Sequence, residues 1–105
     1  MSMHLSEIES KEIIEGYKAK FVHTKTITLA FWEVDENAVL PSHSHFHEQT
    51  SQVLEGQFQL TIDGFSKIYE PGEIVVIPSN AVHEGKAITN CKLLDIFSPV
   101  REDYL

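Results

Sequence analysis

The chain has 105 residues, of which 42% are hydrophobic and 23% are charged, which fits one small globular domain and indicates neither disorder nor a coiled coil. Its formal net charge of −8 excludes a general nucleic-acid binder, because phosphate contacts need a basic surface. The same charge permits an anionic small ligand only where a metal or an arginine supplies local positive charge.

The N-terminal residues 1–19 give an open prediction. Their acidic start lacks the basic and then apolar pattern of a signal peptide, and no apolar run in the chain approaches the ~20 residues of a membrane span. Ser6 and Glu9 have the spacing of a capping box that begins a short helix. The residues that follow, 12–22, suit a strand better. We therefore expect a cytoplasmic protein without a membrane partner, beginning with a strand or arm.

From about residue 20, short apolar segments alternate with turn signals. Expected strands lie within residues 26–34, 57–63, 74–77 and 91–97. Asp63–Gly64 predicts a type I′ hairpin turn. The expected core residues are Phe58, Leu60, Ile62, Ile74 and Val76. Many short strands with almost no helix predict an all-β barrel or sandwich.

The segment 26–34, "TITLAFWEV", is apolar on both faces of the predicted strand. Its two alternating sets are Ile27, Leu29 and Phe31 on one face and Ala30, Trp32 and Val34 on the other. A strand of this kind is usually covered on both faces. Either the chain's own N-terminal strand or a second copy of the chain can cover the second face, and we expect a homodimer.

A cluster of metal-ligand residue types lies in "HSHFHEQ", residues 43–49. His43, His45 and Gln49 share strand parity, so an extended segment would direct all three into one cavity. A further candidate, His83, follows a proline turn in "IPSNAVH". Imidazole suits first-row transition metals, and an amide oxygen is a harder, neutral ligand. The remaining histidines outside any motif, His4 and His23, are expected on the surface.

Two segments resemble the cupin motifs. Residues 41–56, "PSHSHFHEQTSQVLEG", are similar to the first motif, in which two histidines and a carboxylate precede a glycine turn. Residues 71–83, "PGEIVVIPSNAVH", resemble the second motif, which supplies the last histidine. The resemblance covers about residues 20–98 and implies a single jelly-roll β-barrel domain over 1–105, with 99–105 as a C-terminal tail and a metal held inside the barrel.

The sequence departs from the cupin pattern at Gln49, because seven residues before Gly56 the family has a glutamate ligand. Glu48 is adjacent, but its parity turns it away from the cavity. Three histidines and a glutamine form a neutral set, so a divalent ion keeps its full charge and favours Lewis-acid polarisation of an oxygen substrate. Zinc, nickel, manganese, iron and cobalt all fit such a set. His47, which has the parity of the ligands, is either a rival ligand or a residue that faces the substrate.

The C-terminal part of the chain adds two charged candidates. On the predicted last strand, Asp95 shares parity with Leu93 and Phe97 and so lies on an otherwise apolar face, where a carboxylate is either paired or functional. Arg101 follows, and its planar guanidinium suits a carboxylate, either that of Asp95 in a structural ion pair or that of a substrate. Cys91 is the only cysteine, and we expect it to be a core thiol rather than a catalytic one.

This ending, together with the HxHxHEQ pattern, resembles the small cupins of the pectin-degradation, KdgF type. Enzymes of that family convert 4,5-unsaturated uronate monosaccharides, which pectate or alginate lyases release, to the linear 4-deoxy-5-keto uronate. The resemblance implies metal ligation by His43, His45, Gln49 and His83, catalysis or substrate binding by Asp95 and Arg101, and a sugar pocket lined by Phe97. Asp95 would transfer a proton and Arg101 would hold the carboxylate of the sugar.

Two other functions stay open at this point. One is a cupin dioxygenase with a redox metal, which would take up oxygen with a phenolic substrate. The other is a sugar-sensing or metal-storing module, which would bind its ligand tightly without turnover. A cupin that has lost its activity is a third possibility, and the intact ligand set argues against it.

Overall fold

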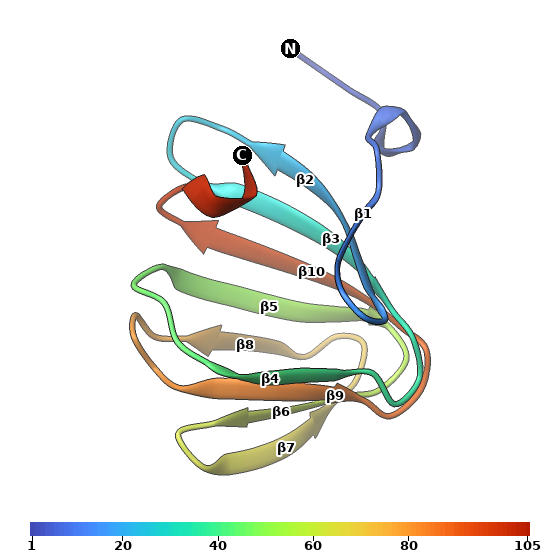
Figure 1. Cartoon of the computed structure of the whole chain (residues 1–105), viewed down its shortest axis with the longest axis vertical. Coiled ribbons are helices and arrows are strands. Elements are labelled where there is room, and N and C mark those ends of the chain that lie inside the picture. The colour runs from blue at the N-terminus through green and yellow to red at the C-terminus, as the bar shows by residue number, and fades with distance from the viewer.

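The computed structural model describes all 105 residues and consists of ten strands and two short 3₁₀ helices (Figure 1). The strands are β1 (Lys11–Ile14), β2 (Tyr17–His23), β3 (Thr28–Val34), β4 (Val39–His43), β5 (Glu48–Glu55), β6 (Phe58–Ile62), β7 (Phe65–Tyr69), β8 (Ile74–Ile77), β9 (His83–Ala87) and β10 (Cys91–Ser98). The 3₁₀ helices are η1 (Leu5–Glu7) and η2 (Glu102–Tyr104). The all-β prediction is confirmed. No helix is long and apolar enough to span a bilayer.

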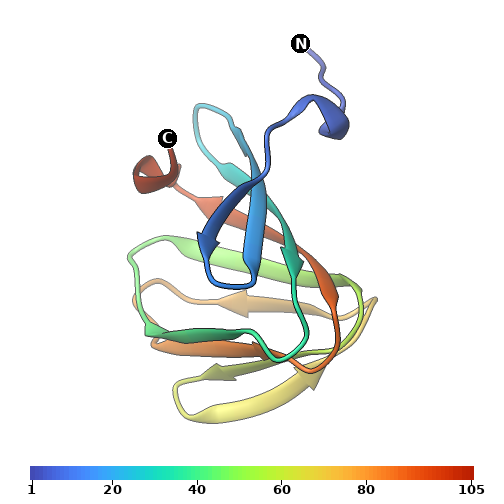
Figure 2. The same ribbon diagram turned by 45° about the vertical axis from the view of Figure 1, so that its right-hand side comes forward.

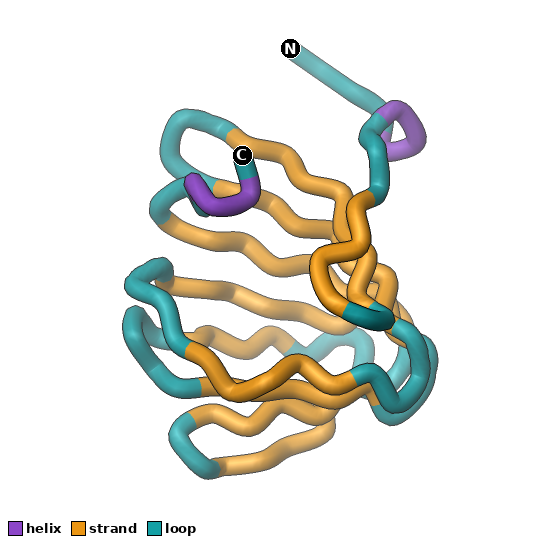
Figure 3. Tube along the Cα trace, viewed as in Figure 1, coloured by secondary structure: helices purple, strands orange, loops and turns teal.

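The strands form two sheets that face each other (Figures 1 and 2). The larger sheet has the order β1-β2-β3-β10-β5-β8, and the smaller has the order β4-β9-β6-β7. Short loops connect the strands (Figure 3). The β2–β3, β4–β5 and β8–β9 loops and the C-terminal η2 lie at the same end of the barrel, on the left in Figure 1. This end holds the candidate site.

The alternating pattern of β3 and β10 places their side chains as the sequence predicts. Ala30, Trp32 and Val34 of β3 are buried in the core. The inward residues of β10 are also buried, namely Cys91, Leu93, Asp95 and Phe97. Cys91 is free and buried, with Sγ donating to the carbonyl of Gln57 at 3.1 Å, so it is a core thiol.

The prediction of which β8 side chains face the core is wrong. Ile74 and Val76 were expected in the core, but they are 65% and 55% exposed, whereas Ile77 is fully buried and Val75 packs against the core. All four residues of this strand are apolar, so the sequence contains no alternation from which the inward face can be read. Elsewhere, Phe58 and Leu60 are buried and Ile62 is partly buried.

The Asp63–Gly64 turn agrees with its prediction, whereas the N-terminal arm differs from it in two respects. Asp63 and Gly64 have positive φ values of 47° and 86°, as the predicted type I′ turn requires. The short helix η1 is capped by the side chain of His4, which accepts from the Ser6 N–H at 3.1 Å, rather than by Ser6. β1 then pairs with β2 at the edge of the larger sheet. It extends the sheet and does not cover its outer face, so that alternative for the second face of β3 is wrong.

Candidate metal centre and its cavity

Three histidines meet at the loop-rich end of the barrel. His43 is the last residue of β4, His83 is the first of β9, and the two are register partners in the smaller sheet. His45 lies in the loop between β4 and β5. One ring nitrogen of each histidine lies within 4.8 Å of those of the other two. The three side chains are therefore placed to share one metal ion.

The second ring nitrogen of each histidine is held by the backbone. The Nδ1 groups donate to carbonyl oxygens, His43 to Pro41 at 2.8 Å, His45 to His47 at 3.0 Å and His83 to Ala81 at 2.9 Å. These bonds fix the neutral tautomer that has its lone pair on Nε2. The Nε2 of His83 is buried and has no hydrogen-bond partner. An unsatisfied buried acceptor is costly, and a metal bond would satisfy it.

Burial favours the neutral form of the His45 and His83 rings. It lowers the pKa of His45 to about 4, and the nearby charge of Arg101 adds to the effect. Burial also lowers the pKa of His83. Because metal binding requires unprotonated imidazole, both rings are in the competent state at neutral pH.

Gln49 completes the set from the inward face of β5. Its side chain is almost fully buried, and its Oε1 lies 3.2 Å from Nε2 of His45. Since Nδ1 of His45 donates to a carbonyl, a proton on Nε2 as well would require the imidazolium that the lowered pKa disfavours. Nε2 and Oε1 thus present lone pairs to each other, an arrangement that a cation between them stabilises. The residues fit a divalent first-row transition metal.

These residues converge by a route that differs from the predicted one. Strand β4 ends at His43, and residues 44–47 form a loop before β5 begins at Glu48. Shared strand parity therefore does not explain how His43, His45 and Gln49 come together. The chain reverses direction between the two sheets, and this reversal turns His45 back toward the strand ends. Glu48 is exposed, as its parity predicts.

His47 lies apart from the three clustered histidines. Its Nε2 is 3.2 Å from the carbonyl oxygen of Val100 in the C-terminal tail, and its ring packs against Phe46 with centroids 4.0 Å apart. It lines a second, more open hollow formed by the β4–β5 loop and the C-terminal tail, which shares His43 and Arg101 with the inner chamber and which we call the outer mouth. The structure thus does not group His47 with the candidate ligands, and its contact with substrate stays a prediction.

A cavity of about 160 Å³ extends from the metal site into the barrel, with mostly apolar walls. The candidate ligands His43, Gln49 and His83 line it together with Asp95 and Arg101. Arg101 is the only lysine or arginine among the lining residues. The chamber is small and enclosed by aromatic and aliphatic side chains, as ligand sites for small molecules commonly are.

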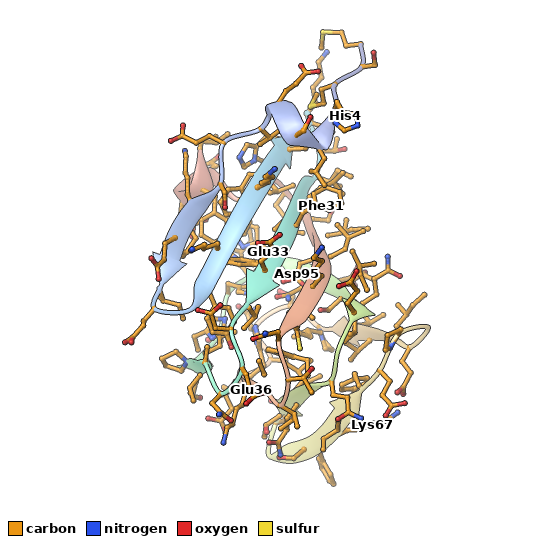
Figure 4. The ribbon with its side chains drawn as sticks, turned by 90° about the vertical axis from the view of Figure 1, so that its right-hand side faces the viewer. His4, Phe31, Glu33, Glu36, Lys67 and Asp95 are labelled. Carbon is orange, nitrogen blue, oxygen red and sulfur yellow. The ribbon has the colours of Figure 1, made fainter.

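Asp95 is the one carboxyl group inside this chamber, on β10 beside β3 (Figure 4). It is 7% exposed and accepts a hydrogen bond from Ser51 Oγ at 2.5 Å. Burial raises the pKa of Asp95 to about 6, although Ser51, Gln49 and Trp32 act in the opposite direction. A carboxyl group with this pKa can both accept and return a proton near neutral pH.

Arg101 does not pair with Asp95. Its guanidinium donates from Nε and Nη2 to the two oxygens of Asp103, at 3.0 and 2.8 Å. The sequence-based alternative of a structural Asp95–Arg101 ion pair is therefore wrong, because a carboxylate two residues away takes that place. The guanidinium carbon also lies 4.6 Å from the centroid of the buried Phe97 ring. Phe97 lines the chamber, and its ring centroid is 5.7 Å from that of His45.

Four residues around the chamber were not singled out from the sequence: Trp32, Ser51, Asp103 and Tyr104. Ser51 lies two residues after Gln49, so strand parity is a signal that would have found it. Trp32 was placed on one of the two apolar faces of the 26–34 strand, but the sequence did not show which of these faces is the inner one. Asp103 and Tyr104 belong to the predicted tail, where the sequence has no strand alternation from which the direction of a side chain could be predicted.

The two remaining histidines lie outside the cluster. His4 is exposed on the N-terminal arm, as predicted (Figure 4). His23 is only partly exposed, with Nδ1 at 2.9 Å from the hydroxyl of the fully buried Thr28. The prediction of a surface position is thus only partly correct for His23.

Comparison with known proteins identifies the family. The family model described as "Cupin domain" matches residues 30–97. The chain belongs to the cupin family. The pectin degradation protein KdgF of Dickeya dadantii (strain 3937) is 26% identical over 98 residues, which cover 90% of this chain and 89% of that protein. The similarity agrees with the resemblance found in the sequence.

Solved cupin structures superpose closely on this chain. The structure of KdgF from Halomonas sp. has a TM-score of 0.90 and 28% identity, and the match covers 95% of this chain and 94% of that one. An RmlC-like cupin from Shewanella frigidimarina NCIMB 400 has a TM-score of 0.91 and 30% identity, covering 99% and 97% of the two chains. The cupin-type fold predicted from the sequence is confirmed.

Proposed function

We propose that this cupin is a metal-dependent enzyme of pectin degradation, which converts a 4,5-unsaturated uronate monosaccharide to the linear 4-deoxy-5-keto uronate. The main support for this proposal is that one chamber is lined by candidate metal ligands, by the buried carboxyl group of Asp95 and by the guanidinium of Arg101. The likeness to KdgF extends over 90% of the chain and supports the substrate class.

The proposed substrate suits the charge of the chamber. A uronate carries one carboxylate, and Arg101 is the only lysine or arginine among the lining residues. Two of its N–H groups bind Asp103, and Nη1 has no protein acceptor. A guanidinium edge can bind a carboxylate through two parallel hydrogen bonds. Arg101 therefore holds the uronate carboxylate in this proposal, and the Phe97 ring packs against the apolar face of the sugar.

The proposed reaction is an isomerisation. The hydroxyl at C1 loses its proton, the bond between C1 and the ring oxygen breaks, and C1 becomes an aldehyde. The ring oxygen remains on C5 as an enol, which becomes a ketone when C4 gains a proton. Atoms and electrons balance without an oxidant or reductant, so the residues need only to move a proton and stabilise charge on oxygen.

The side chains divide these tasks. A divalent metal ion held by His43, His45, Gln49 and His83 would supply Lewis-acid polarisation at oxygen. Asp95 accepts and returns the proton, and burial raises its pKa to about 6 in the metal-free protein. Its Ser51 hydrogen bond fixes the carboxyl group in the chamber. The apolar walls exclude water and thereby strengthen these electrostatic interactions.

A direct assay tests this function. The protein loaded in turn with zinc, nickel, manganese, iron or cobalt is incubated with unsaturated galacturonate, and the ultraviolet absorbance of the 4,5-double bond is followed. Loss of absorbance well above the spontaneous rate is expected, with almost none for Asp95→Asn. A rate equal to the spontaneous one with every metal bound would refute the proposal. Oxygen consumption with a phenolic substrate would instead indicate a dioxygenase, and tight sugar binding without turnover would indicate a binding module.

A further inference from the structure

The C-terminal turn holds the Arg101 guanidinium from several sides. Asp103 accepts two hydrogen bonds from it, and the Asp103 carboxylate is 57% exposed, whereas the Arg101 side chain is 9% exposed. The pKa of Asp103 is lowered chiefly by its hydrogen bonds from Arg101. The pair therefore lies at the boundary between chamber and solvent, with Arg101 on the inner side.

Two aromatic rings pack against the Arg101 guanidinium. The guanidinium carbon lies 4.6 Å from the ring centroid of Phe97 and 4.3 Å from that of Tyr104. Tyr104 in turn stacks on Phe21 of β2 with centroids 4.6 Å apart. The backbone is fixed as well, since the Arg101 N–H donates to the hydroxyl of the buried Thr28 at 2.9 Å. Rings restrict tilt of the guanidinium but leave it free to rotate in its plane.

Asp103 fixes that rotation. Its two oxygens bind Nε and Nη2, which form one edge of the planar group, at 3.0 and 2.8 Å, and these are the guanidinium's two well-aligned hydrogen bonds to side chains. The opposite edge, with Nη1, is left to a ligand. Arg101 borders both the inner chamber and its outer mouth. A carboxylate entering through the mouth would therefore meet a guanidinium that is already oriented.

We propose that Asp103 is a positioning residue, which orients the guanidinium of Arg101 so that its unpaired edge binds the carboxylate of the ligand. This inference rests on the proposed function for the identity of the ligand as a uronate. A competing role makes the opposite prediction. If Asp103 merely neutralised Arg101 and competed with the ligand, its removal would strengthen anion binding. The Asp103 charge is largely exposed, so solvent screens its repulsion of a ligand, whereas the loss of orientation is not screened.

The test compares Asp103→Asn, Asp103→Glu and the control Glu102→Gln. Glu102 precedes Asp103 and makes no side-chain hydrogen bond with Arg101, so the control removes the same charge without freeing the guanidinium. Galacturonate, a stable uronate, serves as the probe in calorimetric titrations. We expect Asp103→Asn to weaken its binding about tenfold and to raise KM for unsaturated galacturonate by a similar factor, with kcat changed little. Asp103→Glu should restore part of the affinity, and Glu102→Gln should not weaken it.

Nuclear magnetic resonance gives a readout that does not depend on turnover. The Nε–H signal of Arg101 should be observable in the wild type and in Glu102→Gln, and should broaden or shift in Asp103→Asn. Binding by Asp103→Asn as tight as or tighter than that of the wild type would overturn the proposal. Failure of the proposed function would look different, because wild type would then bind galacturonate in an Asp103-dependent way but would not turn over the unsaturated sugar.

Discussion

Replacing Asp95 by asparagine should stabilise the protein while abolishing its activity. The carboxyl group is buried, and burial raises its pKa from 3.8 to about 6. Each pKa unit corresponds to about 1.4 kcal/mol between the two protonation states, so ionised Asp95 destabilises the folded state by roughly 3 kcal/mol. Asparagine is nearly isosteric and can still accept from Ser51. It carries no charge, and it cannot act as a base.

The sign of the pH dependence follows from proton linkage. Between pH 4 and pH 6 the folded protein retains the Asp95 proton, whereas the unfolded chain has lost it. The folded state thus binds more protons, and its stability falls as pH rises through this window. The excess stability of Asp95→Asn should therefore grow from near zero below pH 4 to its full value above pH 6, where it raises the melting temperature by several degrees or more.

Urea unfolding of both proteins at pH 4 and pH 7.5, after metal removal with a chelator, measures this difference. Other groups titrate equally in both proteins, so they cancel in the comparison. Asp35→Asn, at an exposed position, controls for the lower net negative charge. With a metal bound, its charge lowers the pKa of Asp95 and the stability gap should narrow. An Asp95→Asn protein less stable than wild type at pH 7.5 would refute the reasoning, because the ionised carboxylate would then be stabilising the fold.

Three further predictions concern other parts of the molecule. His83→Ala should release the metal, measured by elemental analysis, while circular dichroism and melting remain close to those of the metal-free wild type; full metal content would exclude His83 as a ligand. Phe31, whose register partner Leu94 also faces outward, lies within the apolar outer face of the larger sheet (Figure 4). Phe31→Lys should convert a dimer to a monomer of 11.9 kDa in sedimentation experiments, and a wild type that is already monomeric at micromolar concentration would remove the dimer hypothesis. Cys91 is buried, and burial raises its pKa, so it should react with a thiol reagent only on unfolding; rapid labelling of the folded protein, or loss of turnover in Cys91→Ala, would contradict a core role.

The alternation of inward and outward residues along single strands was the sequence feature that best predicted which side chains face the barrel interior. Strand β10 shows why, because Leu93, Asp95 and Phe97 fall two residues apart and the backbone pleat alone directs them to one face. The unusual residue in that row, Asp95, could therefore be placed inside the barrel from the sequence. Where every residue is apolar, as in β8, the same rule does not show which side chains point inward, and Ile74 was assigned to the wrong face.

Residues outside strands could not be placed in this way. His45 reaches the other histidines because the chain turns between β4 and β5, and this turn depends on how the two sheets pack. Arg101 was expected to meet the carboxylate of Asp95 or of a substrate, but its partner in the chain is Asp103, since the tail folds into a short helix with Tyr104 against Phe21. Long-range packing determines such contacts, and the local pattern of apolar and polar residues contains no information about that packing.

The arrangement of charge explains how a protein with a net charge of −8 can have a site suited to an anion. Charges separated by more than about 10 Å are largely screened at ordinary ionic strength, so carboxylates on the exposed strand faces act weakly inside the chamber. There burial favours the neutral forms of His45 and His83, and Asp95 is partly protonated near pH 6. Asp103 lies on the solvent side of Arg101. A divalent ion at the histidines would add positive charge that no lining residue fully offsets. In the proposed function the chamber would thus attract a carboxylate despite the acidic chain, and the neutral Gln49 in place of an acidic ligand would increase that attraction.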